Sequence, residues 1–312
     1  MRLLISISLF LIGASLLAAA DRPAAPWPPP EGVLRVIIDT DAGAEIDDQY
    51  ALSLALGSPS RIHLEGIVGA YFGDFGGSSG ASQSVAEIER VLAKAGLSGK
   101  IPVKAGAPPF VFLDRPPESD GVRFILEKAR ASSPDNPLWV VSLGPATDVA
   151  AALSLDPGIA DRMIVLWHGR TQWPLRCWNY NVWNDPKAAR LLFSLPCRLI
   201  LFDTGDHLTA SVEETGERFA KLGPLGAYLQ QIRSKRPGFL LPTKSMFDLG
   251  DLTALVDPQA VQWERVEAPA VDYDLRYDFS KKMGKIVRIY YVDRNRAFGD
   301  LEGALRTLST SR

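Results

Sequence analysis

The chain has 312 residues, of which 46% are hydrophobic and 22% charged, and its formal charge is −2. This size and composition fit one large globular domain with a sizeable core better than a string of small domains. Because no run of Lys or Arg is longer than a pair, the sequence lacks the basic footprint expected for binding nucleic acid or an anionic membrane, and a small molecule is the expected partner.

The first twenty residues are typical of a cleaved signal peptide. Arg2 precedes a long apolar stretch, and Ala18 and Ala20 have the A-x-A spacing that signal peptidase reads. We predict a signal peptide over residues 1–20, a Pro-rich linker over 21–32 and a single domain over 33–312. The alternative is an uncleaved anchor, since about 18 apolar residues can just span a bilayer. Cleavage predicts a periplasmic or extracellular protein with no membrane segment in its mature form.

After the linker, short apolar runs rich in β-branched residues recur along the chain, and each is followed by a loop and a helix-like stretch. Such a run suits a strand that is buried on both faces of a parallel sheet. The predicted strands are residues 33–38, 62–68, 101–103, 138–143, 163–167 and 199–202. The alternation predicts an α/β fold with an open, mostly parallel, Rossmann-like sheet flanked by helices.

Three further segments complete the predicted scaffold. Residues 82–95 carry apolar side chains at helical spacing with charge on the other face, which is typical of a helix that packs on a core. Residues 263–293 indicate two strands, an antiparallel pair at the sheet edge, and residues 301–308 indicate a closing helix.

Only two cysteines are present, Cys177 and Cys197. Export would place them in an oxidising compartment where a disulfide can persist. The sequence does not decide whether they meet, and two partly buried thiols are the favoured reading.

Four acidic residues, Asp39, Asp41, Asp47 and Asp48, follow the first predicted strand and lead into a helix. In open α/β sheets ligands bind beyond the carboxyl ends of the strands. Carboxylates so close together repel one another and require a cation, shared protons or solvent. Ca²⁺ fits best because it accepts roughly six to eight oxygen ligands, and zinc is disfavoured because no His or Cys cluster accompanies the acids. A stabilised helix start would explain only the last two acids.

This arrangement, DTDAG followed by an Asp pair at the head of a helix, resembles the nucleoside hydrolase family. Three further segments resemble motifs of that family in the same order. They are LGPATDVAAAL at 143–153, NYNVWNDPKAARLLF at 179–193 and MFDLGDLTALVDP at 246–258. Together the four segments cover roughly residues 33–310, and the ordered set is far more specific than any one motif.

The resemblance implies a fold of the nucleoside hydrolase type and Ca²⁺-dependent hydrolysis of the N-glycosidic bond of ribonucleosides or related ribosides. It also allows a homo-oligomer. The implied roles are metal ligand and water-activating base for Asp41, metal ligands for Asp48, Asp248 and the backbone carbonyl of Thr147, ribose contacts for Asp47 and Asn181, and support of the cluster for Asp39. Thr147 and Asp248 would also fit as helix N-caps.

Physical chemistry independent of the resemblance also favours cleavage of a glycosidic bond at a cluster of carboxylates with a bound metal. Attack at an anomeric carbon passes through an oxocarbenium-like transition state. Carboxylates stabilise the developing positive charge, and a bound metal lowers the pKa of the attacking water.

The chain departs from the family pattern at the leaving-group side. Phe247 stands where inosine- and uridine-preferring members carry a His that protonates the departing base, and Asn179 stands in place of a Glu, so its expected substrate contact is in doubt. His168, directly after the predicted strand 163–167, is the candidate substitute acid, although a lone His is more often an ordinary loop residue. Trp178 could stack on a planar base or pack in a lid.

The loop before the Asp pair is also longer than in the family. Three residues separate Gly43 from Asp47 where the family usually has one. Glu45 in this loop could add a charge at the rim of the site or face solvent, and solvent is the favoured reading.

Parts of the sequence are compatible with two other functions. A haloacid-dehalogenase-like phosphohydrolase would use Asp39 as nucleophile with magnesium, but that superfamily does not place an Asp pair six residues after its second Asp. An exported, non-catalytic nucleoside- or riboside-binding protein is suggested by Phe247 and Asn179, whereas retention of Asp41 argues for catalysis.

Overall fold

The computed structural model describes residues 22–73, 77–235, 241–281 and 283–310. The predicted signal peptide lies outside these residues. Within them, no helix has both the length and the apolar composition needed to cross a membrane.

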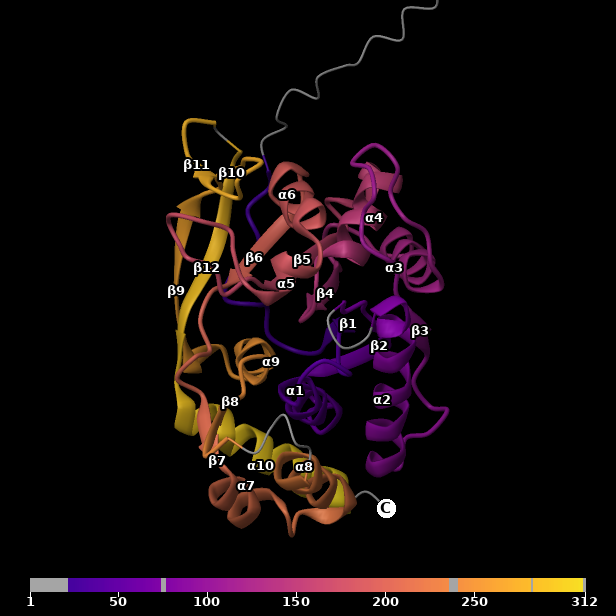
Figure 1. Cartoon of the computed structure of the whole chain (residues 1–312), viewed down its shortest axis with the longest axis vertical. Helices are drawn as coiled ribbons and strands as arrows, with labels where there is room; N and C mark the ends of the chain where they lie inside the picture. The colour runs from indigo at the N-terminus through magenta and orange to yellow at the C-terminus, as the bar shows by residue number, and fades with distance from the viewer. Residues whose placement is uncertain (1–21, 74–76, 236–240, 282, 311–312) are drawn as a thin grey trace, which may run out of the picture.

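An eight-stranded sheet forms the centre of the molecule (Figure 1), in the order β3-β2-β1-β4-β5-β6-β12-β9. Its strands are β1 (Leu34–Thr40), β2 (Ile62–Gly69), β3 (Val103–Ala105), β4 (Leu138–Ser142), β5 (Met163–His168), β6 (Arg198–Phe202), β9 (Val261–Glu267) and β12 (Lys285–Val292). Neighbouring strands pair in parallel except β9, which is antiparallel to β12 at the edge. The predicted open, mostly parallel sheet with an antiparallel edge is confirmed.

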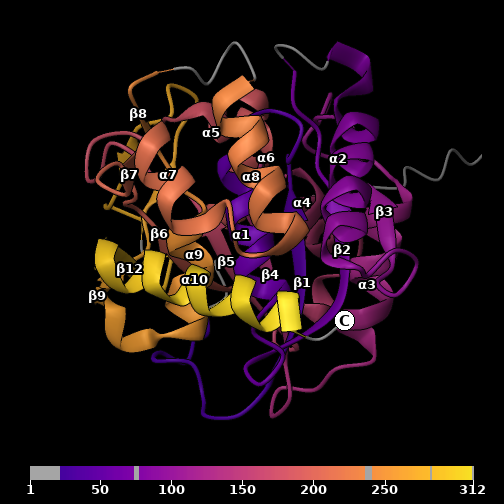
Figure 2. The same ribbon diagram turned by 90° about the horizontal axis from the view of Figure 1, so that it is seen from below.

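Helices cover both faces of this sheet. They are α1 (Asp47–Leu56), α2 (Gly80–Ala95), α3 (Asp120–Arg130), α4 (Thr147–Leu155), α5 (Tyr180–Asn184), α6 (Pro186–Ser194), α7 (Val212–Phe219), α8 (Gly223–Lys235), α9 (Leu249–Val256) and α10 (Arg294–Thr310). In Figure 1, α3, α4 and α6 lie above the sheet and α1, α8, α9 and α10 below it. Figure 2 shows α7, α8 and α10 in front of the sheet when the molecule is seen from below.

Two small antiparallel pairs lie outside the main sheet. They are β7 (Thr209–Ser211) with β8 (Thr243–Ser245), and β10 (Ala270–Val271) with β11 (Tyr277–Asp278).

The apolar run in β1 shows why continuous hydrophobic segments form this sheet. Val36 and Ile38 pack into the core on one face and Ile37 into the core on the other, and all three are fully buried. Side chains alternate between the faces of a strand, so a strand covered on both sides needs an apolar residue at every position. Burial of each such side chain contributes about 1.5–3 kcal/mol.

Element boundaries differ from the sequence prediction by a few residues. Helix α2 starts at Gly80, two residues before the predicted start. A Cβ at Gly80 would lie 2.1 Å from the carbonyl oxygen of Phe72, so only glycine fits at this position. The third strand starts at Val103 rather than at residue 101, and Pro102, which has no N–H to donate, precedes it. The closing helix is longer than predicted.

The Pro-rich segment packs against the domain. Ala25 and Trp27 join the core, and Arg22 is 4% exposed. In the described part of this segment, residues 22–32, the chain is therefore part of the folded body rather than a free linker.

Candidate active site

The acidic cluster lies where the topology of the sheet opens a crevice. β1 lies between β2 and β4, so the loops that follow β1 and β4 leave the sheet toward opposite faces. Ligands bind at such switch points, outside the carboxyl ends of the strands. A pocket at this position is lined by Asp41, Ala44, Glu45, Asp47, Asp48, Leu143, His168, Arg170, Asn179, Tyr180, Asn181, Phe247 and Asp248.

Hydrogen bonds hold the acids in place at and just beyond the end of β1. Asp39 is fully buried in the strand and accepts a hydrogen bond from the Ser142 hydroxyl at 3.1 Å. The Thr40 hydroxyl donates to Asp48 Oδ1. The carbonyl of Asp41 accepts from the backbone N–H of Ala44 at 2.7 Å, which forms the turn into α1. The longer loop therefore still brings Asp41 and the Asp pair into one pocket.

Three carboxylates form the tightest group. Asp47, Asp48 and Asp248 each offer an oxygen within 4.8 Å of the other two, and all three are buried. Asp248 takes the N-cap position of α9, yet its side chain makes no capping hydrogen bond, so the expected alternative role as a helix cap is not what holds this carboxylate. Asp41 lines the same pocket but does not belong to this group. Asp47, for which a sugar contact alone was expected, does belong to it.

Burial and mutual repulsion raise the pKa of two of these acids. Burial, and then repulsion by Asp48, raises the pKa of Asp41 well above its ordinary value. Burial and repulsion by Asp47 and Asp48 do the same to the pKa of Asp248. A hard divalent cation relieves both effects and matches the all-oxygen ligand set, so these residues fit the implied metal.

Thr147 contacts Asp185 through its side chain, which contacts none of the three grouped carboxylates. It is the first residue of α4, and its hydroxyl donates to Asp185 Oδ2 at 2.8 Å. It does not line the pocket, and the metal-ligand role of its carbonyl stays a prediction.

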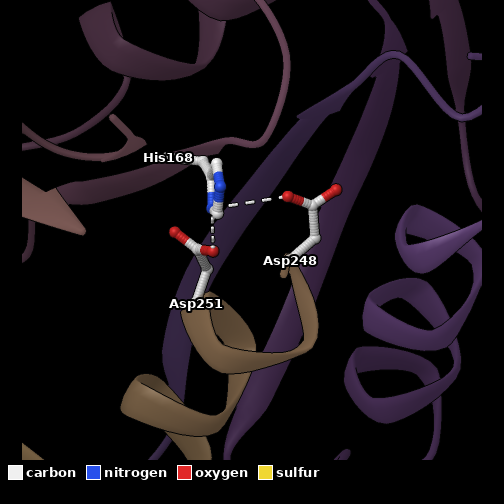
Figure 3. Close-up of side chains that lie close together, drawn as sticks. All are labelled: His168, Asp248 and Asp251. Carbon is white, nitrogen blue, oxygen red and sulfur yellow. Dashed lines mark hydrogen bonds and ion pairs between the residues drawn. The ribbon is translucent and has the colours of Figure 1, made fainter. Parts of the chain in front are cut away.

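His168 ends β5 and reaches the pocket, where it faces two carboxylates (Figure 3). Its Nδ1 lies 2.7 Å from Asp251 Oδ2 and 3.4 Å from Asp248 Oδ1. Sequence reasoning placed His168 at the active edge but missed Asp251. The spacing of Asp248 and Asp251, three residues apart at the start of a helix, places both on one face and could have revealed it.

The two asparagines of the 179–193 segment line the pocket in different ways. Asn181 donates from Nδ2 to the carbonyls of Leu143 at 2.6 Å and His168 at 3.2 Å, which ties together the ends of β4 and β5. Asn179 caps α5, and its Oδ1 accepts from the N–H of Val182 at 2.8 Å. Its expected contact with substrate therefore competes with a capping role.

Trp178 does not line the pocket. The Arg176 guanidinium lies 5.9 Å from its ring, and the side chain is 37% exposed. Stacking of Trp178 on a base stays a prediction.

Two cations flank the ring of Phe247. The Arg170 guanidinium lies 4.5 Å and the Lys244 ammonium 4.7 Å from the ring centre. Lys244 also lies 2.5 Å from a carboxylate oxygen of Glu45 and 3.5 Å from one of Asp47. The Glu45 side chain is 45% exposed, and its carboxylate pairs with Lys244, which is distant in sequence, at the pocket rim. Glu45 therefore adds a charge at the rim and is also partly open to solvent.

Cys177 and Cys197 are both buried and carry free thiols. The favoured reading of two buried thiols agrees with this structure.

Comparisons with known proteins extend over most of the chain. A family model described as inosine-uridine preferring nucleoside hydrolase matches residues 36–297. A probable uridine nucleosidase 2 of Arabidopsis thaliana is 27% identical over 234 residues, which are 64% of this chain and 68% of that protein.

Solved structures show the same fold. A purine-preferring ribonucleoside hydrolase from Gardnerella vaginalis aligns with a TM-score of 0.70 at 21% identity over 89% of this chain and 100% of the other. An inosine-uridine preferring nucleoside hydrolase from Bacillus anthracis aligns with a TM-score of 0.66 at 14% identity over 88% and 99%. The chain therefore belongs to the inosine-uridine preferring nucleoside hydrolase family, and it is a hydrolase that acts on N-glycosyl bonds.

Proposed function

We propose that this protein hydrolyses the N-glycosidic bond of ribonucleosides, or of closely related ribosides, with a water molecule held by Ca²⁺. One observation carries the proposal: Asp41, Asp47, Asp48 and Asp248 converge in a single pocket at the switch point of the sheet. So dense a group of buried carboxylates suits both a hard cation and the positive charge that develops on a sugar ring during cleavage.

The proposed metal-binding and water-activating roles fall on different residues of the pocket. Asp48 and Asp248 would hold the metal with the carbonyl of Thr147, and Asp41 would bind it and take the proton of the attacking water. When bound, Ca²⁺ would lower the pKa of that water and hold vicinal hydroxyls.

The remaining polar groups face the sugar. Asp47 and Asn181 would bind ribose hydroxyls, and Asp39, hydrogen-bonded to Ser142, would support the cluster from within β1. The leaving group would lie toward Phe247, whose side chain has no proton to donate to a departing base.

Asp41→Asn is the test of the water-activating role. The change keeps the shape of the side chain but removes the base, so turnover should fall by at least about a hundredfold while the fold is kept. The measurement is release of reducing sugar from purine, pyrimidine and modified ribosides in the presence of calcium. The relatives are described as acting on uridine or preferring purines, so both base classes belong in the panel. Asp120→Asn, on an exposed carboxylate, is the matched control.

Calcium binding has its own test. Elemental analysis of the purified protein should find bound calcium, and chelation should lower the melting temperature, because a ligand that binds only the folded state stabilises it. Absence of calcium together with an unchanged melt would remove the metal site as proposed.

A second candidate is an exported riboside-binding protein without catalysis. Phe247 in the leaving-group region and the capping role of Asn179 favour it, since neither supplies an acid. Calorimetric binding of ribosides with no turnover on the whole panel would establish this alternative in place of the hydrolase.

Export to the periplasm or the medium is part of the proposal. Its support is the apolar N-terminal stretch with Ala18 and Ala20 in signal-peptidase spacing. N-terminal sequencing of protein secreted by a host that expresses the full chain should find a mature start close to residue 21. Size-exclusion chromatography of the same material would test for a homo-oligomer.

A further inference from the structure

We propose that Asp251 is a positioning residue that holds His168 with its Nδ1–H toward Asp251, so that Nε2 of His168 hydrogen-bonds a hydroxyl group of the sugar. This inference rests on the proposed function and deepens it, because it assigns one further sugar contact and the residue behind it.

Among the described residues, the acceptors near the His168 ring lie at its Nδ1 atom. Asp251 Oδ2 lies 2.7 Å and Asp248 Oδ1 3.4 Å from Nδ1, and both carboxylates come from the start of α9 (Figure 3). An ionised carboxylate accepts hydrogen bonds and donates none. The proton of a neutral imidazole is therefore drawn to Nδ1.

Asp251 forms a buried group with His168 and Asp248, in which each residue offers a polar atom within 4.8 Å of the others. It is fully buried on the first turn of α9, and its Oδ1 has no hydrogen-bond partner among the described residues. Burial of a carboxylate in a helix is costly unless the charge is paired. The hydrogen bond to His168 offsets the free-energy cost of burying the Asp251 carboxylate. The same bond fixes the orientation of the imidazole.

The surroundings hold the ring at the border of the acidic cluster. The imidazole contacts the ring of Phe202, at 5.7 Å, and that of Phe247, at 6.4 Å between centroids. Asn181 donates to the carbonyl of His168 and so anchors the backbone. With Nδ1 engaged, Nε2 is the polar ring atom that remains for the pocket that His168 lines.

A hydroxyl group complements that atom in either protonation state. It donates to Nε2 of the neutral ring and accepts from Nε2–H of the charged ring. Nδ1 of His168 lies 3.4 Å from Asp248, a proposed ligand of the metal that would hold the vicinal hydroxyls of the sugar, and on this ground we assign Nε2 to a sugar hydroxyl. The specificity expected from His168 is thus for a sugar hydroxyl.

The tautomer can be observed directly. The chain has three histidines, so ¹⁵N-histidine labelling gives a simple spectrum, and His168→Gln identifies the signals of His168. At a pH where the ring is neutral, we expect the Nδ1–H form in the wild type and a shift toward Nε2–H in Asp251→Asn. A wild-type His168 with Nε2–H, or with a metal on Nδ1, would overturn the proposal.

The sugar contact is tested with ribosides that lack one hydroxyl each. For one of these the wild type should lose about tenfold in kcat/KM, the value of one hydrogen bond. His168→Ala should lose that discrimination, mainly through KM on the parent riboside, and Asp251→Asn should weaken it. Thr253→Ser, on the same helix and equally buried, is the control and should keep the wild-type pattern.

The results separate this inference from the proposed function. Discrimination that is unchanged in both His168→Ala and Asp251→Asn refutes the sugar contact even though the wild type cleaves ribosides. If the wild type cleaves none, the proposed hydrolysis fails, and calorimetric binding of the same deoxy-ribosides decides the contact. Thermal melts of every variant show whether a loss reflects unfolding.

Discussion

Lys244 is the residue that partly balances the acidic pocket. Its ammonium group lies 2.5 Å from Glu45 and 3.5 Å from Asp47, and its side chain is 9% exposed. It thereby places a positive charge beside the buried carboxylate of Asp47 and the partly exposed carboxylate of Glu45.

Lys244→Met should have opposite effects on stability and on calcium affinity. Loss of the ammonium should lower the stability of the metal-free protein by about 1–3 kcal/mol, measured by urea unfolding with a chelator present. Calcium should bind more tightly, because a competing positive charge is gone, and titration calorimetry measures this. Lys285→Met, which breaks a pair whose two side chains are about equally exposed, at 60% and 61%, should change neither quantity. Weaker calcium binding by Lys244→Met would contradict the argument.

Calcium affinity should also depend on pH through Asp48. Burial, and then repulsion by Asp47, raises the pKa of Asp48 to about 7. A carboxylate binds metal in its deprotonated form, so a raised pKa means that protons compete with calcium up to neutral pH. Affinity should be at least about tenfold higher at roughly pH 8 than at roughly pH 6, as measured by calorimetry. In Asp48→Asn this dependence should largely vanish. Equal affinity of the wild type at both values would argue against Asp48 as a ligand.

The sequence could predict the acids but not their neighbours. Four of the acids fall within ten residues of the chain, at and after the end of a strand, so the local chain path is enough to bring them close. They are Asp39, Asp41, Asp47 and Asp48. Asp251 meets His168 across 83 residues, and such a pairing becomes visible only once α9 is packed beside β5.

At the scale of elements, the strands that could be predicted from the sequence are those buried on both faces of the sheet. Strands covered on both faces were recognised because every position must be apolar. The pairs β7–β8 and β10–β11 were missed, since strands of two or three residues are too short to show a period. The Pro-rich segment was misjudged because proline content suggests a linker, whereas Trp27 within it packs into the core.

Arg22 ties this N-terminal segment to the end of helix α6. Its guanidinium donates to the carbonyls of Leu192 at 3.0 Å, Phe193 at 2.8 Å and Cys197 at 3.2 Å. The last carbonyls of a helix have no partner within the helix, and burial without one is unfavourable. Arg22 therefore acts as a C-terminal cap supplied from a distant part of the chain.

Arg22→Met should destabilise the protein without impairing the site. Loss of charged hydrogen bonds to buried carbonyls should lower the free energy of unfolding by about 2–3 kcal/mol, measured by urea unfolding. The kcat/KM for a riboside should stay at the wild-type value well below the melting temperature, because Arg22 lies near the start of β6, at the edge of the sheet opposite the pocket. Arg123→Met, on an exposed arginine paired with Asp120, should cost less than about 0.5 kcal/mol. Equal losses in both variants would refute the capping role.

At the scale of the whole molecule, the site exists only when the sheet is complete. The pocket draws residues from the loop after β1, the ends of β4 and β5, helix α5 and the start of α9. These segments span most of the range that the family model matches, residues 36–297. No contiguous fragment of the chain contains the acidic cluster together with His168 and Asp248 unless it also contains most of the sheet.

The two hydrophobic cores should unfold together. One core packs beneath helices α1, α2, α8, α9 and α10, the other beneath α3, α4 and α6, and β1 contributes Val36 and Ile38 to the first and Ile37 to the second. Loss of either helical layer exposes an apolar face of the shared sheet, so a state with one layer missing is unfavourable. We expect a single calorimetric transition whose calorimetric and van't Hoff enthalpies agree, and equal protection from hydrogen exchange for peptides from α1 and α4. Two separate transitions, or much weaker protection of one helix, would show that the layers fold as independent units.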